Sequence, residues 1–247
     1  MVERPEDKTT GSKDSGKSKT SVMPELIAYL FVGLIPMFGL ALLLVGLQPI
    51  ALTFSLGFYL FGSLLIILLM RMGYPHPSLG FGNLVTLGRF IAVAALASSL
   101  LVSANAWFVI FVALISLIFD GVDGYLARKE GRVSDFGARL DMEVDSALAL
   151  LLALNLWLSG ITGPIILLLG LPRYLFVFVA RFLPWLRRPL QYSLSRRVIS
   201  VVQIASLIGL HAPFLPDVVI TPVAWIVAGL LVWSFGRDIA WLWRSRV

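Results

Sequence analysis

The feature that most constrains this chain is the length of its uncharged stretches. No Asp, Glu, Lys or Arg occurs from Leu26 to Met70, a run of 45 residues, or from Phe90 to Phe119, a run of 30 residues. A helix that crosses the roughly 30 Å hydrocarbon core of a bilayer needs about 20 apolar residues. Each run is therefore expected to contribute to two membrane spans. Only 14% of all residues are charged, against about 25% in soluble domains, so a water-soluble globule is excluded.

Breaks in the apolar pattern predict an all-α integral membrane protein with about eight transmembrane helices. The expected spans are residues 25–47, 50–70, 88–103, 106–128, 135–158, 161–181, 196–212 and 218–242. Residues 1–22 are rich in Ser, Thr, Gly and charged side chains, which predicts a disordered tail.

The basic residues predict the orientation of these spans. The net charge is +6, yet the basic residues are spread among short loops rather than gathered in one patch, so no nucleic acid partner is expected. With the N-terminus inside, nineteen of the twenty Lys and Arg residues fall in the tails or inner loops, and only Arg173 lies within a span. Cytoplasmic loops of membrane proteins carry such an excess. Both termini are therefore predicted to be cytoplasmic, with the plasma (inner) membrane as the expected location.

Half of the acidic residues are concentrated in one segment. Seven of the fourteen lie between Asp120 and Asp145, and none lies from Leu26 to Phe119. Asp120 and Asp123 are three residues apart, and Asp141 and Asp145 are four apart, so each pair shares a helix face. The short link between the two spans predicts antiparallel neighbours. Four carboxylates are thus expected to meet just inside the cytoplasmic interface.

This cluster predicts a site for divalent cations. The chain has no Cys and only two His, and hard oxygen ligands alone favour Mg²⁺, Mn²⁺ or Ca²⁺. Two such ions are a common device for displacement at phosphorus. Gly124, Ala127 and Gly137 lie on the same faces and leave room for a nucleotide. The alternative structural interpretation is a set of helix-end caps and ion pairs with Arg128, Lys129, Arg132 and Arg139.

The same residues form a motif that resembles that of the CDP-alcohol phosphatidyltransferases. The motif DxxDGxxAR(x8)GxxxDxxxD is filled at every fixed position from Asp120 to Asp145. The segment from Gly82 to Arg89 also looks like the Asn-x-Leu/Val-Thr-x-x-Arg pattern at the start of the family's first core helix. The resemblance implies a six-helix core in residues 81–247, preceded by two additional transmembrane helices in residues 23–80.

The resemblance implies an enzyme that transfers a phosphatidyl group from a CDP-linked lipid, such as CDP-diacylglycerol, to a small alcohol and releases CMP. Asp120, Asp123 and Asp141 would then bind two divalent cations, Mg²⁺ or Mn²⁺, while Asp145 would approach a metal and act as general base. The residues implied to bind CDP are Asp120, Asp123, Gly124, Ala127, Arg128, Gly137, Asn83 and Thr86. Because dimers are common in the family, a homodimer is among the expected partners, together with the lipid bilayer.

The acceptor alcohol is less constrained. Arg173, Arg196 and Arg197 are candidates for binding it, and guanidinium groups suit an anionic polyol phosphate such as glycerol 3-phosphate. Choline, serine and inositol remain alternatives for the same chemistry. A divalent-cation transporter is the alternative from another class, but a transporter site is usually near the midplane and duplicated by repeats, whereas this chain has one acidic cluster.

Overall fold

The computed structural model of the protein describes residues 19–183, 185 and 194–244. The predicted tail at residues 1–22 falls almost entirely outside them. The described part is helical throughout and contains no strand, in agreement with the predicted fold class. The elements are α1 (Lys19–Val45), α2 (Pro49–Arg71), α3 (Gly80–Leu96), the 3-10 turn η1 (Ala97–Leu100), α4 (Ala106–Lys129), α5 (Asp135–Leu158), the 3-10 turn η2 (Pro164–Ile166), α6 (Leu167–Gly170), α7 (Pro172–Phe182), α8 (Leu194–Gly209) and α9 (Asp217–Arg244).

Fewer helices than the predicted eight have the length and composition of a membrane span. Among the described residues, α1, α2, α3, α4 and α9 qualify, and a sixth span results if α6 and α7 are counted together. Those two helices meet at a 67° bend, so the predicted helical span 161–181 is broken rather than one continuous helix. The apolar part of α8 is short, Val198–Gly209, and α5 carries Asp135, Asp141, Glu143 and Asp145 in its first half.

The predicted breaks between helices are present and have recognisable local causes. Pro49 opens α2, where the missing amide proton costs nothing. Asn105 caps α4 by accepting a hydrogen bond from the Trp107 amide at 2.9 Å. Ser159 ends α5, and Gly160 follows with a φ of +74°, a conformation that suits glycine.

Helix α3 lies at the centre of the described bundle. It packs against α1, α2, α4 and α5. Of its most apolar 18-residue stretch, 78% is buried, against 28% for α1 and 22% for α2. The Tyr59 hydroxyl of α2 donates to the Leu30 carbonyl of α1, and the Tyr29 hydroxyl of α1 donates to the Leu84 carbonyl of α3. The outward faces of α1 and α2 expose large apolar side chains such as Phe31, as expected where helices face lipid.

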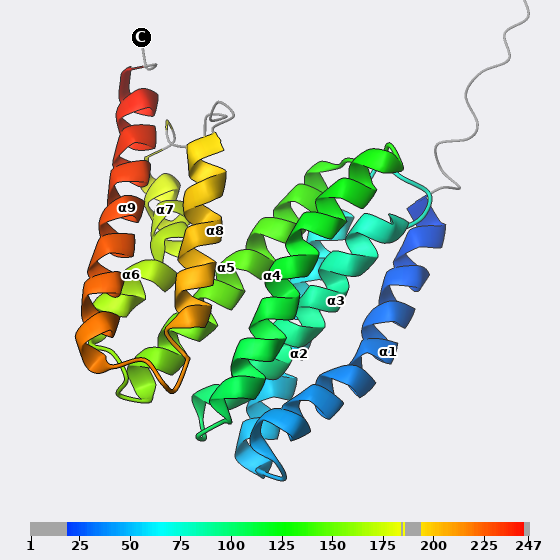
Figure 1. The fold of residues 1–247 in the computed structure, drawn as a ribbon. Helices are drawn as coiled ribbons and strands as arrows, with labels where there is room; N and C mark the ends of the chain where they lie inside the picture. Colours follow the sequence, from blue (N-terminus) through cyan, green and yellow to red (C-terminus); the bar gives the residue numbers. More distant parts are fainter. Residues whose placement is uncertain (1–18, 184, 186–193, 245–247) are drawn as a thin grey trace, which may run out of the picture.

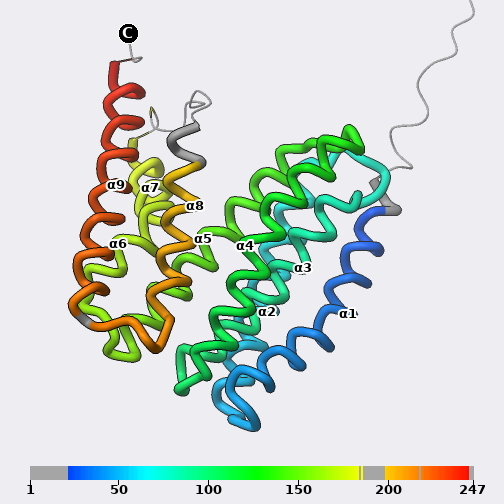
Figure 2. Tube along the Cα trace, in the orientation of Figure 1, coloured from blue at the N-terminus to red at the C-terminus, as the bar shows by residue number. Residues whose placement is uncertain are grey.

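Helix α5 connects two groups of helices. Figure 1 shows α1 to α4 on one side and α6 to α9 on the other, and the trace in Figure 2 follows the same path. Helix α5 packs against α3 in the first group and against α6 and α8 in the second. The start of α1, the α4–α5 turn and the end of α9 all lie at one end of the molecule (Figure 1). The carboxylate-rich parts of α4 and α5 are next to that end.

Candidate active site

The turn between α4 and α5 places two pairs of aspartates near one another. Gly131 has a φ of +64°, and the Arg132 amide donates to the Ala127 carbonyl, the pattern of a glycine-terminated helix. The Ser134 side chain then caps α5 by accepting from the Gly137 amide at 3.1 Å. Beyond this turn α4 and α5 make few direct contacts, because both pack on α3. The two helices run antiparallel as predicted (Figure 1), and their four carboxylates meet beside α3, on which both helices pack.

Arg89 of α3 lies at the centre of the four aspartates. Its Nη1 is 2.7 Å from Asp123 and 2.6 Å from Asp141. Its Nη2 is 3.2 Å from Asp120 and also forms an ion pair with Asp145. The Arg89 side chain is only 2% exposed. All four predicted aspartates are thus joined by one buried guanidinium.

Asp123 is the most enclosed of the four aspartates, at 5% exposed. Its Oδ2 accepts from Arg89 and, at 3.0 Å, from the Thr86 hydroxyl, while its Oδ1 accepts from the Gly124 amide at 2.6 Å. Thr86 was predicted to bind CDP, and the structure places it beneath Asp123. The close approach of α3 to α4 depends on Gly82, where an added Cβ would be 2.9 Å from the Asp123 carbonyl oxygen.

The other three aspartates form a group that fits a hard divalent cation. Asp120, Asp141 and Asp145 each have one carboxylate oxygen such that all three atoms lie within 4.8 Å of one another. The side chains are 25%, 36% and 23% exposed, so ligands can approach them. A set made only of carboxylate oxygens suits Mg²⁺ or Mn²⁺ and does not suit thiol- or imidazole-preferring metals.

Asn83, also predicted to bind CDP, is buried between α3 and α5. Its Nδ2 donates to the Tyr74 hydroxyl at 3.0 Å and to the Leu79 carbonyl at 2.6 Å. Burial raises the pKa of Tyr74 above its ordinary value, so the hydroxyl stays protonated and donates to the Leu79 carbonyl. An added Cβ at Gly137 would be 2.7 Å from the Asn83 Oδ1. Gly137 therefore permits close packing of α5 on Asn83.

The remaining motif residues lie along α4. The Ala127 methyl group faces Gly82 of α3, where an added Cβ would be 3.0 Å from it. Arg128 is exposed and its guanidinium lies beside Gly124. The motif therefore places Ala127 at the α3–α4 contact and leaves Gly124 and Arg128 on the more open side of the helix.

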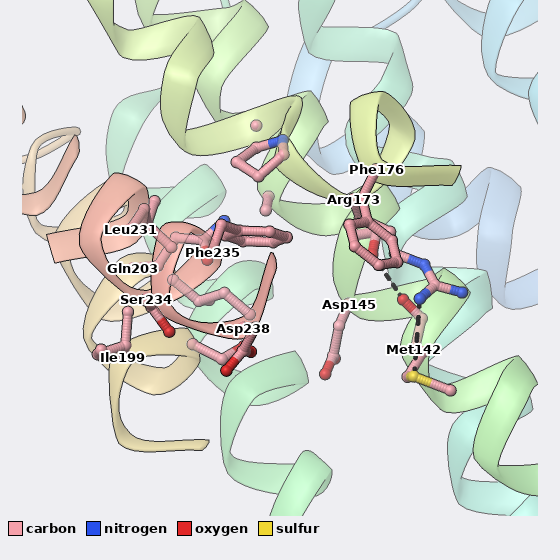
Figure 3. Close-up of a pocket in the computed structure, with 16 residues that line it drawn as sticks. Met142, Asp145, Arg173, Phe176, Ile199, Gln203, Leu231, Ser234, Phe235 and Asp238 are labelled. Atoms are coloured by element: carbon pink, nitrogen blue, oxygen red, sulfur yellow. Dashed lines mark hydrogen bonds between the residues drawn. The ribbon is translucent and has the colours of Figure 1, made fainter. Parts of the chain in front are cut away.

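A cavity of about 280 Å³ adjoins Asp145 on the side away from α3. Figure 3 shows Asp145 on one side of this cavity and Asp238 and Ser234 of α9 on the other. Helices α5, α7, α8 and α9 supply its walls. The polar lining residues are Asp145, Ser146, Arg173, Ser200, Gln203, Ser234 and Asp238.

Only one of the three predicted acceptor-binding arginines has a described side chain. Arg173 lies at the start of α7, lines the cavity and forms an ion pair with Glu143. Figure 3 shows its guanidinium turned toward Met142 rather than toward Asp238. The side chains of Arg196 and Arg197 lie outside the described residues. Of the described residues of α8, Ile199, Ser200 and Gln203 line the same cavity.

Comparison with known proteins assigns the chain to a family. The profile of the CDP-alcohol phosphatidyltransferases matches residues 80–233, which include α3, the four aspartates and most of the cavity. The chain belongs to the CDP-alcohol phosphatidyltransferase family. Its members are enzymes of phospholipid biosynthesis, and the predicted enzyme class is confirmed. The family match begins where α3 begins, so α1 and α2 precede it.

A curated relative adds a shorter match. The CDP-diacylglycerol–serine O-phosphatidyltransferase of Methanocaldococcus jannaschii is 41% identical to this chain over 60 residues. That segment is 24% of this chain and 28% of the relative, so the similarity spans less than a third of either protein. No solved structure matches the chain.

Sequence reasoning missed Arg89 as a member of the aspartate cluster. The third span was predicted to begin only at residue 88, and Arg89 at that boundary was counted with the inner loop before it, whereas α3 begins at Gly80. Arg89 is in the third turn of that helix and buried. A charged residue within a membrane helix is expected to meet a counter-charge, and a correct helix boundary combined with that rule would have identified it.

Proposed function

We propose that this chain transfers the phosphatidyl group of CDP-diacylglycerol to a small alcohol and releases CMP, with two divalent cations bound at the aspartate cluster. The observation that carries the proposal is the position of Asp145. It belongs to the four-aspartate cluster and also lines the adjacent cavity. A group shared by a metal site and a cavity can act on a molecule bound in that cavity.

The aspartates supply the metal ligands. Asp120, Asp141 and Asp145 would hold the cations, with Asp123 completing the cluster. Two divalent cations, when bound, neutralise the charge of a pyrophosphate and stabilise the entering and leaving oxygens. The donor nucleotide would lie over α4 beside Gly124 and Arg128, on the open side of the helix.

Asp145 is proposed as the general base. It takes the proton of the acceptor hydroxyl, whose oxygen forms a bond to the phosphorus that carries diacylglycerol. The bond between that phosphorus and the CMP oxygen breaks, and CMP leaves with the electron pair. A positioned base contributes about 10² to 10⁴ in rate.

For the acceptor we propose serine. The relative whose name includes serine supports this choice. Asp145, Ser200, Gln203 and Ser234 offer oxygen atoms along the cavity that suit an ammonium group, and Asp238, which also pairs with Arg237, lines the same cavity. The expectation of glycerol 3-phosphate depended on three arginines, and Arg173 is engaged by Glu143. Because the chain also has Arg196 and Arg197, an anionic acceptor such as glycerol 3-phosphate is the alternative to be tested against serine.

The deciding experiment is an acceptor panel. Purified protein in detergent is incubated with radiolabelled CDP-diacylglycerol and Mn²⁺, and with serine, glycerol 3-phosphate, inositol or choline in separate reactions. We expect CMP release and a new lipid with serine. A product with glycerol 3-phosphate alone would contradict the acceptor assignment. Absence of CMP release with every alcohol would contradict the reaction itself.

We also propose that both termini and the site face the cytoplasm of the plasma membrane. The shared end of α1, the α4–α5 turn and α9 in Figure 1 supports this orientation. The natural chain has no Cys, so single cysteines can report on it. In intact cells Ser103→Cys should react with a membrane-impermeant maleimide and Lys129→Cys should not. The reverse pattern would overturn the orientation.

A further inference from the structure

Arg89 carries an unusual share of the charge balance at the site. Among the described residues it is the one basic side chain that forms an ion pair with any of the four aspartates. Four carboxylates and one guanidinium give a formal charge of −3. Like charges this close repel strongly where water is excluded, so the aspartates depend on nearby positive charge, and Arg89 supplies it.

The way Arg89 divides its contacts indicates more than charge neutralisation. Nη1 contacts Asp123 of α4 and Asp141 of α5, and Nη2 contacts Asp120 of α4 and Asp145 of α5. Each terminal nitrogen therefore links α4 to α5. These helices make few direct contacts with each other. One side chain of α3 thus sets the separation between the two aspartate pairs.

The contacts also leave part of each partly exposed carboxylate available. Arg89 is bonded to the Oδ1 atoms of Asp120, Asp141 and Asp145. Their Oδ2 atoms accept no hydrogen bond from the described residues. Arg89 is buried beneath these side chains, whereas the carboxylates themselves are partly exposed. The guanidinium can therefore remain in place while each of these carboxylates still has an oxygen available to a cation.

We propose that Arg89 is a positioning residue: a built-in counter-cation that links the aspartates of α4 and α5 and keeps the site assembled before metal binds. The inference rests on the metal-binding part of the proposed function. Arginine suits this role, since a planar fork with two terminal nitrogens can bridge two pairs of carboxylates at once. A lysine offers three donors on a single nitrogen, so it cannot occupy both nitrogen positions.

The test is thermal unfolding in EDTA and in saturating Mn²⁺ for the full chain in detergent. We expect Arg89→Met to lower the midpoint in EDTA on the order of 10 °C, because it leaves carboxylates without their buried partner. Mn²⁺ should recover much of that loss, so the midpoint gain on adding Mn²⁺ exceeds that of the wild type. A gain equal to the wild-type gain would overturn the proposal.

Charge-compensating and control variants separate this role from simple packing. In EDTA, Arg89→Met/Asp123→Asn should be more stable than Arg89→Met alone, because the most buried carboxylate no longer needs a counter-charge. Arg89→Lys should fall between wild type and Arg89→Met. Arg173→Met removes an ion pair beside the same cavity, and its gain with Mn²⁺ should equal the wild-type gain. Additive losses in the double variant would contradict the proposal.

Two further outcomes are informative. Recovery of folded Arg89→Met only in the presence of Mn²⁺ would support the role, whereas failure of both Arg89→Met and the double variant under all conditions would overturn it. If the wild type shows no response to Mn²⁺, the metal part of the proposed function fails. Rescue in EDTA by Asp123→Asn would in that case still support Arg89 as the counter-cation, so the two failures are distinguishable.

Discussion

On one side of Asp145 the polar groups bind one another, whereas on the other side they line a cavity. Toward α3, Arg89, Thr86 and Asp123 are buried and joined by ion pairs and hydrogen bonds. Toward α9, Ser234 and Asp238 face Asp145 across open space (Figure 3). The α3 side therefore tolerates little change, while the cavity side can accept different side chains without disturbing the aspartates. Under the proposed function, donor chemistry and acceptor choice would belong to different helices.

Of the variants that test the difference between the two sides, Asp120→Ala is expected to have the largest effect on metal binding and activity. It removes a carboxylate from the group that fits a divalent cation, so Mn²⁺ binding and CMP release should both be lost. Calorimetry with Mn²⁺ and the CMP-release assay measure the two effects. Asp135→Ala, at the exposed start of α5, is the matched control and should retain both. Undiminished Mn²⁺ binding in Asp120→Ala would contradict its assignment as a ligand.

Asp145→Asn should separate binding from turnover. The amide keeps the size of the side chain but cannot accept the hydroxyl proton, so we expect kcat to fall by about 10² to 10⁴. Binding of Mn²⁺ and of CDP should remain, because the amide oxygen can still serve as a metal ligand and the other aspartates are unchanged; calorimetry measures both. Near wild-type turnover would show that the cavity side does not depend on this base.

Gly82→Ala tests how closely the α3 side is packed. The new methyl group would be 2.9 Å from the Asp123 carbonyl oxygen and 3.1 Å from the Ala127 amide nitrogen. Backbone atoms cannot move aside easily, so we expect a loss of about 1–3 kcal/mol in stability. Gly121→Ala is the matched control, because a Cβ there meets nothing within 4 Å. Equal unfolding midpoints for the two variants would argue against tight α3–α4 packing.

Ser234→Ala should give the smallest effect, confined to the cavity side. Loss of one hydrogen bond worth about 0.5–1.5 kcal/mol would raise KM for the acceptor about 2- to 12-fold. KM for CDP-diacylglycerol should not change. Ser206→Ala, a serine of α8 outside the cavity lining, is the control. A rise in KM for both substrates would mean that the cavity and the aspartate cluster do not bind acceptor and donor independently.

Local sequence was sufficient to predict an all-helical membrane protein and the aspartate cluster, but not the number and bounds of the spans. The uncharged runs predicted membrane helices, and the spacing of Asp120, Asp123, Asp141 and Asp145 predicted their common faces. Both signals are periodic and local, so they survive in a single sequence. The assignment of metal and substrate roles to these residues stays a prediction.

The start of α3 could not be predicted from local sequence. The Leu79 amide donates to Glu25 of α1 at 3.2 Å, and the Phe81 amide donates to Glu130 at 3.1 Å. Amides at a helix start need such acceptors, and here both come from distant parts of the chain. Because the start of α3 was mispredicted, Arg89 was not recognised as a buried residue of that helix. Its role in linking the aspartates of α4 and α5 was therefore not predicted.

The packing of α1 and α2 on α3 has a consequence for the segment that matches the family. Tyr59 of α2 stacks on Phe90 with ring centroids 5.2 Å apart, and Ser55 donates to the Ala94 carbonyl. Phe90 is next to Arg89 in the chain. Removal of α1 and α2 would therefore expose one side of α3, the helix that carries Arg89. The first two helices and the segment that matches the family therefore share one packed interface, which supports the helix that carries Arg89.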